Sequence, residues 1–263
     1  NFSRLIQLLS DTFQKWEDPP LTFGLGAAGS DSSIMQRIKH DISQSLKMPI
    51  ADEEKGNLYI RIIPAYKQQG WEILIRLTPY PLSARQWRIQ NIPGALNATV
   101  AYAMTKLANT SSDAVVNLCS GTATILIEQA KQHNNRHMIA IDNDMTMLHA
   151  ASQNIDASHS SNYITQIKCD AQQTPFPKNS IGCLYADLPF GHHIGSHNEN
   201  EWLYPAILEE SARIAKTGAP FIVLTHEIQL IEQSLQSSRW KTNQQIKINL
   251  SGLHPQIFVL ERI

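Results

Sequence analysis

The sequence has few cysteines, few charged residues and no long apolar run. Its three cysteines, Cys119, Cys169 and Cys183, form no C-x-x-C pair, which argues against a disulfide framework or a zinc site and favours a reducing, cytoplasmic setting. No apolar stretch approaches the roughly 18–20 residues that a membrane-spanning helix needs. The first 20 residues are amphipathic and lack a basic end leading into an apolar block, so we expect no signal peptide and no membrane partner.

Neither sign of charge is in excess. The 22 Lys+Arg nearly balance 23 Asp+Glu, for a net charge of −1, so the strongly basic surface that most readily indicates a nucleic-acid partner is absent. Residues 1–95 carry 11 Lys+Arg and 9 Asp+Glu, and the remainder carries 11 and 14. The 42% apolar content is enough for a sizeable core, in one large or two modest domains.

The two halves of the chain have different patterns. Residues 1–92 predict a small α+β domain, with helices over 2–13 and 32–46 and strands over 21–25, 57–63 and 71–77. The proline-bearing segment 79–92 is typical of a linker.

From residue 93 to residue 263, strands and helices alternate. We expect strands at 114–118, 137–141, 163–168, 181–186 and 220–225, with helices between most of them. Such alternation predicts a parallel sheet covered on both faces. The chain ends in two strands, 240–250 and 256–263, joined by a short Gly/Pro turn, which predicts an antiparallel hairpin.

A glycine pattern in the first half resembles a dinucleotide-binding loop. Gly24, Gly26 and Gly29 satisfy G-x-G-x-x-G between a strand and a helix. A dinucleotide site would need an acidic residue at the end of the next strand and further βα units, and residues 57–92 supply neither. We therefore interpret the glycines as a flexible strand-to-helix turn.

Three polar features follow successive strands of the second half. Ser120 to Ala123 form a small-residue turn before a helix, where backbone N–H groups can bind a ligand. Asp142 ends the next strand, where a carboxylate can accept both hydroxyls of a ribose, whereas Asp144 better suits a helix N-cap. Asp170 could accept a hydrogen bond from an adenine amino group or form an Asx turn.

A fourth feature, Asp187-Leu188-Pro189-Phe190-Gly191, follows the apolar strand 181–186. Such a loop can present a carboxylate oxygen and a backbone carbonyl to a planar amino group. Phe190 could stack on the ring that carries the amine, which is worth about 1–3 kcal/mol per base. The alternative is an Asp-Pro turn with a core phenylalanine.

These four motifs resemble those of the class I S-adenosylmethionine-dependent methyltransferases, and specifically the RNA methylases that modify N2 of guanosine in tRNA or rRNA. The resemblance covers residues 93–263 and implies an α/β, Rossmann-like sheet of seven strands with the last antiparallel. It assigns S-adenosylmethionine binding to Asn117, Cys119, Ser120, Gly121, Thr122, Ala123, Thr124, Asp142, Asn143, Asp170, Ala171 and Asp187. It assigns catalysis to Asp187, Leu188, Pro189 and Phe190, and RNA binding to Phe190, Gly191 and His192.

Two residues depart from the family pattern, since Asn117 replaces an acid and Ala123 a glycine. A non-catalytic RNA-binding protein with a degenerate S-adenosylmethionine site is therefore an alternative. A DNA adenine or protein glutamine N-methyltransferase is another, because the same loop accepts any planar amine. His192, His193 and His197 suggest either a metal site or a substrate-facing loop. We favour the loop and expect no metal, because the glycines among them do not support a helix.

The first half resembles a THUMP domain, an RNA-binding module that often precedes such methylases. Arg85 and Arg88 flank Trp87 in the linker and could contact phosphate and stack on a base. Equally, they could belong to a solvated linker with one anchoring aromatic residue. The slight basic excess of residues 1–95 predicts modest RNA affinity that depends mainly on this half.

Overall fold

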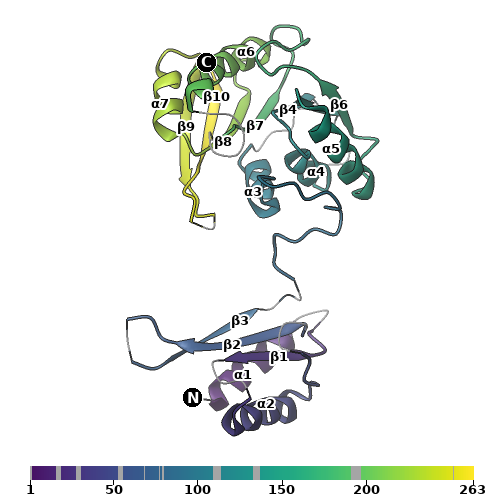
Figure 1. The fold of residues 1–263 in the computed structure, drawn as a ribbon, viewed down its shortest axis with the longest axis vertical. Coiled ribbons are helices and arrows are strands. Elements are labelled where there is room, and N and C mark those ends of the chain that lie inside the picture. The colour runs from purple at the N-terminus through teal and green to yellow at the C-terminus, as the bar shows by residue number, and fades with distance from the viewer. Residues whose placement is uncertain are drawn as a thin grey trace. The chain divides into compact units, whose positions relative to one another are not determined.

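The computed structural model describes residues 2–15, 19–27, 31–52, 56–67, 69–76, 78, 80–108, 114–132, 137–190, 197–250 and 252–263. The chain divides into two compact units, residues 1–82 and 83–263 (Figure 1). Within the described residues, no helix is long and apolar enough to cross a lipid bilayer.

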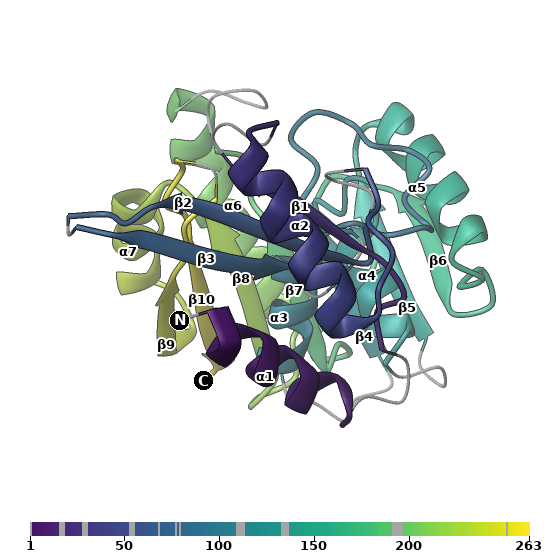
Figure 2. The same ribbon diagram turned by 90° about the horizontal axis from the view of Figure 1, so that it is seen from below.

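The N-terminal unit is a three-stranded sheet with two helices on one face (Figures 1 and 2). Its elements are α1 (Phe2–Phe13), β1 (Phe23–Ala27), α2 (Ser33–Leu46), β2 (Leu58–Pro64) and β3 (Trp71–Arg76). Strand β2 lies in the middle, parallel to β1 and antiparallel to β3. Leu9 and Ile42 from the helices pack on Leu25 and Ile60 of the sheet, because alternate strand residues point to the same face.

Two glycines of the dinucleotide-like pattern are part of the N-terminal sheet. Gly24 and Gly26 lie inside β1, not in the turn that we expected, and Gly29 lies outside the described residues. A Cβ atom on Gly26 would collide with the hydroxyl of Tyr59 on the neighbouring strand. A larger residue at this position would therefore require the side chain of Tyr59 to move.

The C-terminal unit is built on a seven-stranded sheet with the order β6-β5-β4-β7-β8-β10-β9. The strands are β4 (Ala114–Leu118), β5 (His137–Asp142), β6 (Ile164–Lys168), β7 (Cys183–Asp187), β8 (Pro220–Thr225), β9 (Trp240–Lys247) and β10 (Gln256–Arg262). Strands β4 to β8 are parallel, and β10 is antiparallel to both of its neighbours. The expected seven-stranded sheet with an antiparallel last strand is confirmed.

Helices cover both faces of this sheet. The helices α3 (Ala98–Ala108), α4 (Thr124–Ala130) and α5 (Met145–Ala157) pack on one face, and α6 (His197–Ile214) and α7 (Ile228–Gln236) pack on the other. Neighbouring strand residues alternate between the two cores, so Val115 packs with the first group and Val116 with the second. Helix α3 is not among the elements that the sequence predicted.

The second half of the proline-bearing segment belongs to the C-terminal unit. Trp87 is buried in the core beneath α3, α4 and α5. The backbone N–H of Gln90 donates to Oδ1 of Asn154 (2.8 Å), and Nδ2 of Asn154 donates to the carbonyl of Gln90 (3.0 Å). The boundary between the units therefore falls at residue 82, ten residues before the expected boundary at 92.

The chain reverses its direction of travel across the sheet between β4 and β7. From β4 it proceeds outward through β5 and β6, and then returns to β7 on the other side of β4. In open α/β sheets, ligands bind at the carboxyl ends of the strands at this point. All four sequence motifs follow the carboxyl ends of β4, β5, β6 and β7, so the fold gathers them at one edge.

Candidate active site

The turn after β4 is held in an unusual backbone conformation. Cys119, Gly121 and Ala123 have positive φ angles of 54°, 51° and 62°, a region that L-residues visit infrequently. The backbone N–H of Ser120 donates to the carbonyl of Ile141 (2.7 Å). The turn is thereby attached to the end of β5, immediately before α4 begins.

The side chain of Asp142 holds the turn after β4 to the end of β5 a second time. Its Oδ2 accepts a hydrogen bond from the N–H of Gly121 (2.7 Å), and its Oδ1 accepts one from the N–H of Asp144 (3.0 Å). A carboxylate has about four acceptor positions, so Asp142 can still accept ligand hydroxyls. Asp144 accepts from the N–H of Thr146 (2.7 Å) as the N-cap of α5, which confirms its structural role. Asn143 is exposed between the two acids.

Asn117 and Ala123, the two residues that depart from the family pattern, have buried side chains. The methyl group of Ala123 has no exposed area and packs in the core, so a ligand entering from solvent cannot touch it. Asn117 is also buried, and its Nδ2 donates to the carbonyls of Leu118 (3.2 Å) and Tyr185 (3.1 Å), which joins β4 to β7. Neither side chain is exposed at the carboxyl edge of the sheet.

Three acids surround the thiol of Cys119. Burial, together with the negative charges of Asp142, Asp187 and Asp170, raises the pKa of Cys119 to about 12. The thiol is therefore neutral and unreactive at physiological pH. The motifs after β5, β6 and β7 thus bring their carboxylates together around the motif after β4.

The residues after β6 form the Asx turn, which was one of the two alternatives for Asp170. Oδ1 of Asp170 accepts a hydrogen bond from the N–H of Gln172 (2.9 Å), which is an Asx turn. Ala171 is buried beneath it. Asp170 itself is exposed at the carboxyl edge, so its predicted contact with an adenine amino group stays a prediction.

Asp187 ends β7 with a carboxylate oxygen that is buried and has no hydrogen-bond partner among the described residues. Burial raises the pKa of Asp187 from its ordinary value of 3.8 to about 7. The following residue is fixed: the side chain of Leu188 is buried, and its N–H donates to the carbonyl of Leu224 (3.0 Å). A rigid backbone therefore presents the carboxyl group of Asp187.

The rest of the loop is bound to α6 and to the end of β8. The carbonyl of Pro189 accepts hydrogen bonds from Nδ2 of Asn200 (3.0 Å) and from the hydroxyl of Tyr204 (2.8 Å). The half-buried ring of Phe190 lies 5.9 Å from the ring of His226, measured between centroids. Sequence reasoning missed Asn200, although its i,i+4 spacing from Tyr204 places both side chains on one helix face.

The two arginines predicted to contact RNA make bonds within the protein. Nε of Arg85 lies 2.7 Å from Oε1 of the buried Glu128 on α4. One guanidinium nitrogen of Arg88 donates to the carbonyl of Leu96 (2.7 Å) and to Oγ1 of Thr124 (3.0 Å). The buried Trp87 fits the anchoring aromatic residue of the alternative, but the two arginines are bonded within the protein and do not form the solvated linker that this alternative expected. Phosphate contact by these arginines stays a prediction.

The position of the boundary changes the charge balance of the N-terminal unit. Arg85 and Arg88 belong to the C-terminal unit, and residues 1–82 hold 9 Lys+Arg and 9 Asp+Glu. The basic excess that we ascribed to the first half therefore does not belong to that unit. Net charge gives no reason for RNA affinity to depend mainly on it.

Some site predictions lie outside the described residues, namely Gly191, His192 and His193. Nδ1 of His197, the first residue of α6, lies 3.0 Å from both carboxylate oxygens of Glu227, and this hydrogen bond raises the pKa of His197. Over the part of the chain that the structure describes, no group of three His, Cys, Asp or Glu side chains could hold a metal ion.

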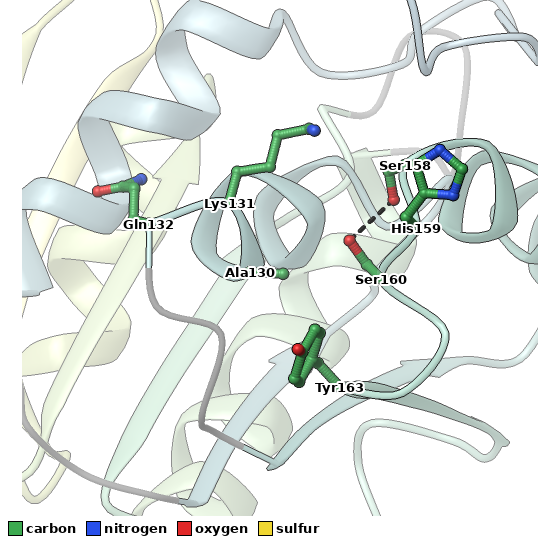
Figure 3. A pocket seen from close by; sticks show the side chains of 7 residues that line it. All are labelled: Ala130, Lys131, Gln132, Ser158, His159, Ser160 and Tyr163. Carbon is green, nitrogen blue, oxygen red and sulfur yellow. Dashed lines mark hydrogen bonds between the residues drawn. The ribbon is translucent and has the colours of Figure 1, made fainter.

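A hollow also lies at the opposite edge of the sheet (Figure 3). It is lined by the C-terminal ends of α4 and α5 and by Tyr163, and the hydroxyl of Ser158 donates to that of Ser160 at its wall (2.9 Å). Lys131 and His159 face it, as expected beside the negative ends of helix dipoles. Since this is the amino edge of the strands, the hollow is not the predicted ligand site.

The chain is similar to curated RNA methyltransferases. The chain is 29% identical over 185 residues to the Bos taurus tRNA (guanine(6)-N(2))-methyltransferase THUMP3, and the match covers 65% of this chain and 37% of that protein. It is 27% identical over 172 residues to the Mus musculus U6 snRNA (guanine-N(2))-methyltransferase THUMPD2, covering 65% of this chain and 30% of that protein. The chain thus spans about a third of the length of these relatives.

The fold has a counterpart among solved structures. TrmN from Thermus thermophilus superposes with a TM-score of 0.72 and 20% identity, and covers 100% of this chain and 80% of that one. The model of the RMKL-like methyltransferase domain matches residues 85–256, which include every described motif of the crevice. The chain therefore belongs to the UPF0020 family, the RMKL-like methyltransferase domain.

Proposed function

We propose that this protein transfers a methyl group from S-adenosylmethionine to the N2 amino group of guanosine in RNA, with tRNA as the first candidate substrate. One observation carries the proposal: a buried carboxylate oxygen of Asp187, at the carboxyl edge of the sheet, has no hydrogen-bond partner among the described residues. The names of the two relatives, which specify guanine N2 in tRNA and in U6 snRNA, support this target. A THUMP-like role in RNA binding for residues 1–82 belongs to the same proposal.

The residues at the carboxyl edge of β4, β5 and β6 suit S-adenosylmethionine. Asp142 keeps acceptor positions for a ribose, and Asp170 is exposed where an adenine amino group would need an acceptor. The hydroxyl oxygen of Ser120 is buried without a partner among the described residues, as expected for a group that bonds a ligand. When bound, the cofactor supplies an electrophilic methyl group on a sulfonium sulfur.

The loop after β7 orients the amine. The amine lone pair of guanine is delocalised into the ring, so alignment limits the reaction. Asp187 accepts one N–H, the carbonyl of Leu188 accepts the other, and Phe190 holds the plane of the base. Orientation of this kind contributes several kcal/mol. As the C–N bond forms and the C–S bond breaks, one N–H proton leaves, and the carboxylate of Asp187 receives it.

Transfer of a labelled methyl group to tRNA tests this proposal. The wild-type chain should label tRNA, and Asp187→Ala should abolish labelling while largely sparing cofactor affinity, measured by calorimetry. Asp144→Asn is the matched control, because asparagine is an equally good N-cap and Asp144 lies outside the proposed contacts. Normal turnover by Asp187→Ala would refute the assignment, and labelling of DNA or protein instead of RNA would favour another substrate class.

A further inference from the structure

The carbonyl of Pro189 is a filled acceptor inside the catalytic loop. A carbonyl oxygen has two lone pairs, and this one already accepts from Asn200 (3.0 Å) and from Tyr204 (2.8 Å). It therefore cannot also accept a hydrogen bond from a substrate amine. By contrast, no described residue donates to Oδ1 of Asp187 or to the carbonyl of Leu188.

The hydrogen bonds behind Tyr204 run in one direction. Its hydroxyl has a single proton, which it donates to Pro189, so at the 2.6 Å contact with Oγ1 of Thr225 the threonine must be the donor. Thr225 in turn accepts from the backbone N–H of Glu227 (3.0 Å). Burial raises the pKa of Tyr204 above its ordinary value of 10, so the tyrosine keeps its proton. A directed chain thus leads from the end of β8 to the loop.

The base of this chain is fixed in the core. Asn200, Tyr204 and Thr225 have no exposed area. Helix α6 is joined to β9 by the indole N–H of Trp240, which donates to the carbonyl of Leu208 (3.0 Å). Groups placed on buried, packed elements hold their geometry better than groups on loops. The donors that hold Pro189 are therefore anchored independently of the loop itself.

We propose that Asn200, Tyr204 and Thr225 are positioning residues for methyl transfer. Asn200 and Tyr204 occupy both lone pairs of the Pro189 carbonyl, and Thr225 orients the hydroxyl of Tyr204. Together they fix the loop and leave the acceptors of Asp187 and Leu188 for the substrate amine. The inference rests on the proposed function, and it concerns residues that touch neither cofactor nor substrate. Thr225 reaches the loop only through the hydroxyl of Tyr204, so its effect on kcat should disappear when that hydroxyl is absent.

Three variants test it: Tyr204→Phe, Thr225→Val and the double variant. Tyr204→Phe should lower kcat about tenfold with cofactor affinity within about twofold, because small displacements of reacting groups have large effects on rate. Thr225→Val should lower kcat about threefold, since the tyrosine can still donate. The double variant should be no slower than Tyr204→Phe.

Stability separates positioning from a merely structural role. Tyr204→Phe leaves the hydroxyl of Thr225 buried without an acceptor. The double variant removes both hydroxyls and should regain only part of the unfolding midpoint, because the N–H of Glu227 loses its acceptor, and it should not regain kcat. Tyr185→Phe is the matched control, because it loses a buried hydrogen bond to Gln129 (2.9 Å) away from the loop. It should lower the midpoint and leave kcat unchanged.

The outcomes separate failure of the positioning inference from failure of the proposed function. Wild-type kcat in Tyr204→Phe, or a kcat that recovers together with stability in the double variant, overturns the inference and leaves the proposed function intact. A wild-type chain with no methyl transfer to any RNA overturns the proposed function, and this inference with it.

Discussion

Replacing Asp187 with asparagine should stabilise the fold at alkaline pH. Burial raises the pKa of Asp187 from 3.8 to about 7. Between these values the native protein keeps a proton that the unfolded chain has lost, so stability falls as the pH rises from about 4 to 7. At about 1.4 kcal/mol for each pH unit, the loss approaches about 4 kcal/mol at pH 8. Asparagine has nearly the same shape and carries no charge.

Urea denaturation at pH 5 and pH 8, followed by the fluorescence of the buried Trp240, measures this effect. The stability advantage of Asp187→Asn over the wild type should grow by about 3 kcal/mol between the two pH values. Asp144→Asn makes the same substitution at an exposed helix cap and serves as the control. If the wild type and Asp187→Asn depend equally on pH, the carboxyl group is not held in a site that disfavours its charge, and the reasoning is wrong.

Three further predictions concern the crevice and its linker. Asp142→Ala should weaken S-adenosylmethionine binding at least about tenfold by calorimetry, because hydrogen bonds to charged groups contribute about 1.5–3 kcal/mol; unchanged affinity would count against the ribose contact. Ala123→Gly should keep that affinity within about twofold, since the methyl group is buried away from any ligand, and a tenfold gain would contradict this. Arg85→Ala should destabilise the C-terminal unit by about 3 kcal/mol in urea, because Glu128 loses its buried partner. Adding Glu128→Gln should recover part of that loss, and an unaffected Arg85→Ala would show that the ion pair contributes nothing.

The sequence predicted the parallel part of the sheet because its strands are short and apolar and most are separated by helical segments. Once β4 to β7 are parallel, their carboxyl ends share one edge, so the motifs must converge there. Helix α3 was missed because residues 98–108 lack charged residues at its start and are apolar on several sides. The side chain of Asn97, which accepts from the N–H of Thr99 (2.9 Å), was the signal that could have revealed its beginning.

Pairings made by tertiary structure could not be predicted in the same way. Arg85 looked like a phosphate ligand because its partner Glu128 lies 43 residues away in the sequence. The bonds from Asn200 and Tyr204 to Pro189 likewise depend on where α6 packs. Local patterns fix the type of an element, whereas the partners of its polar groups depend on the packing of distant segments.

Nucleoside mass spectrometry of tRNA treated with the protein and S-adenosylmethionine tests the central claim most directly. The account predicts N2-methylguanosine with the wild-type chain and none with Asp187→Ala. A methyl group on adenine N6, or none in RNA under conditions where the cofactor binds, would contradict it.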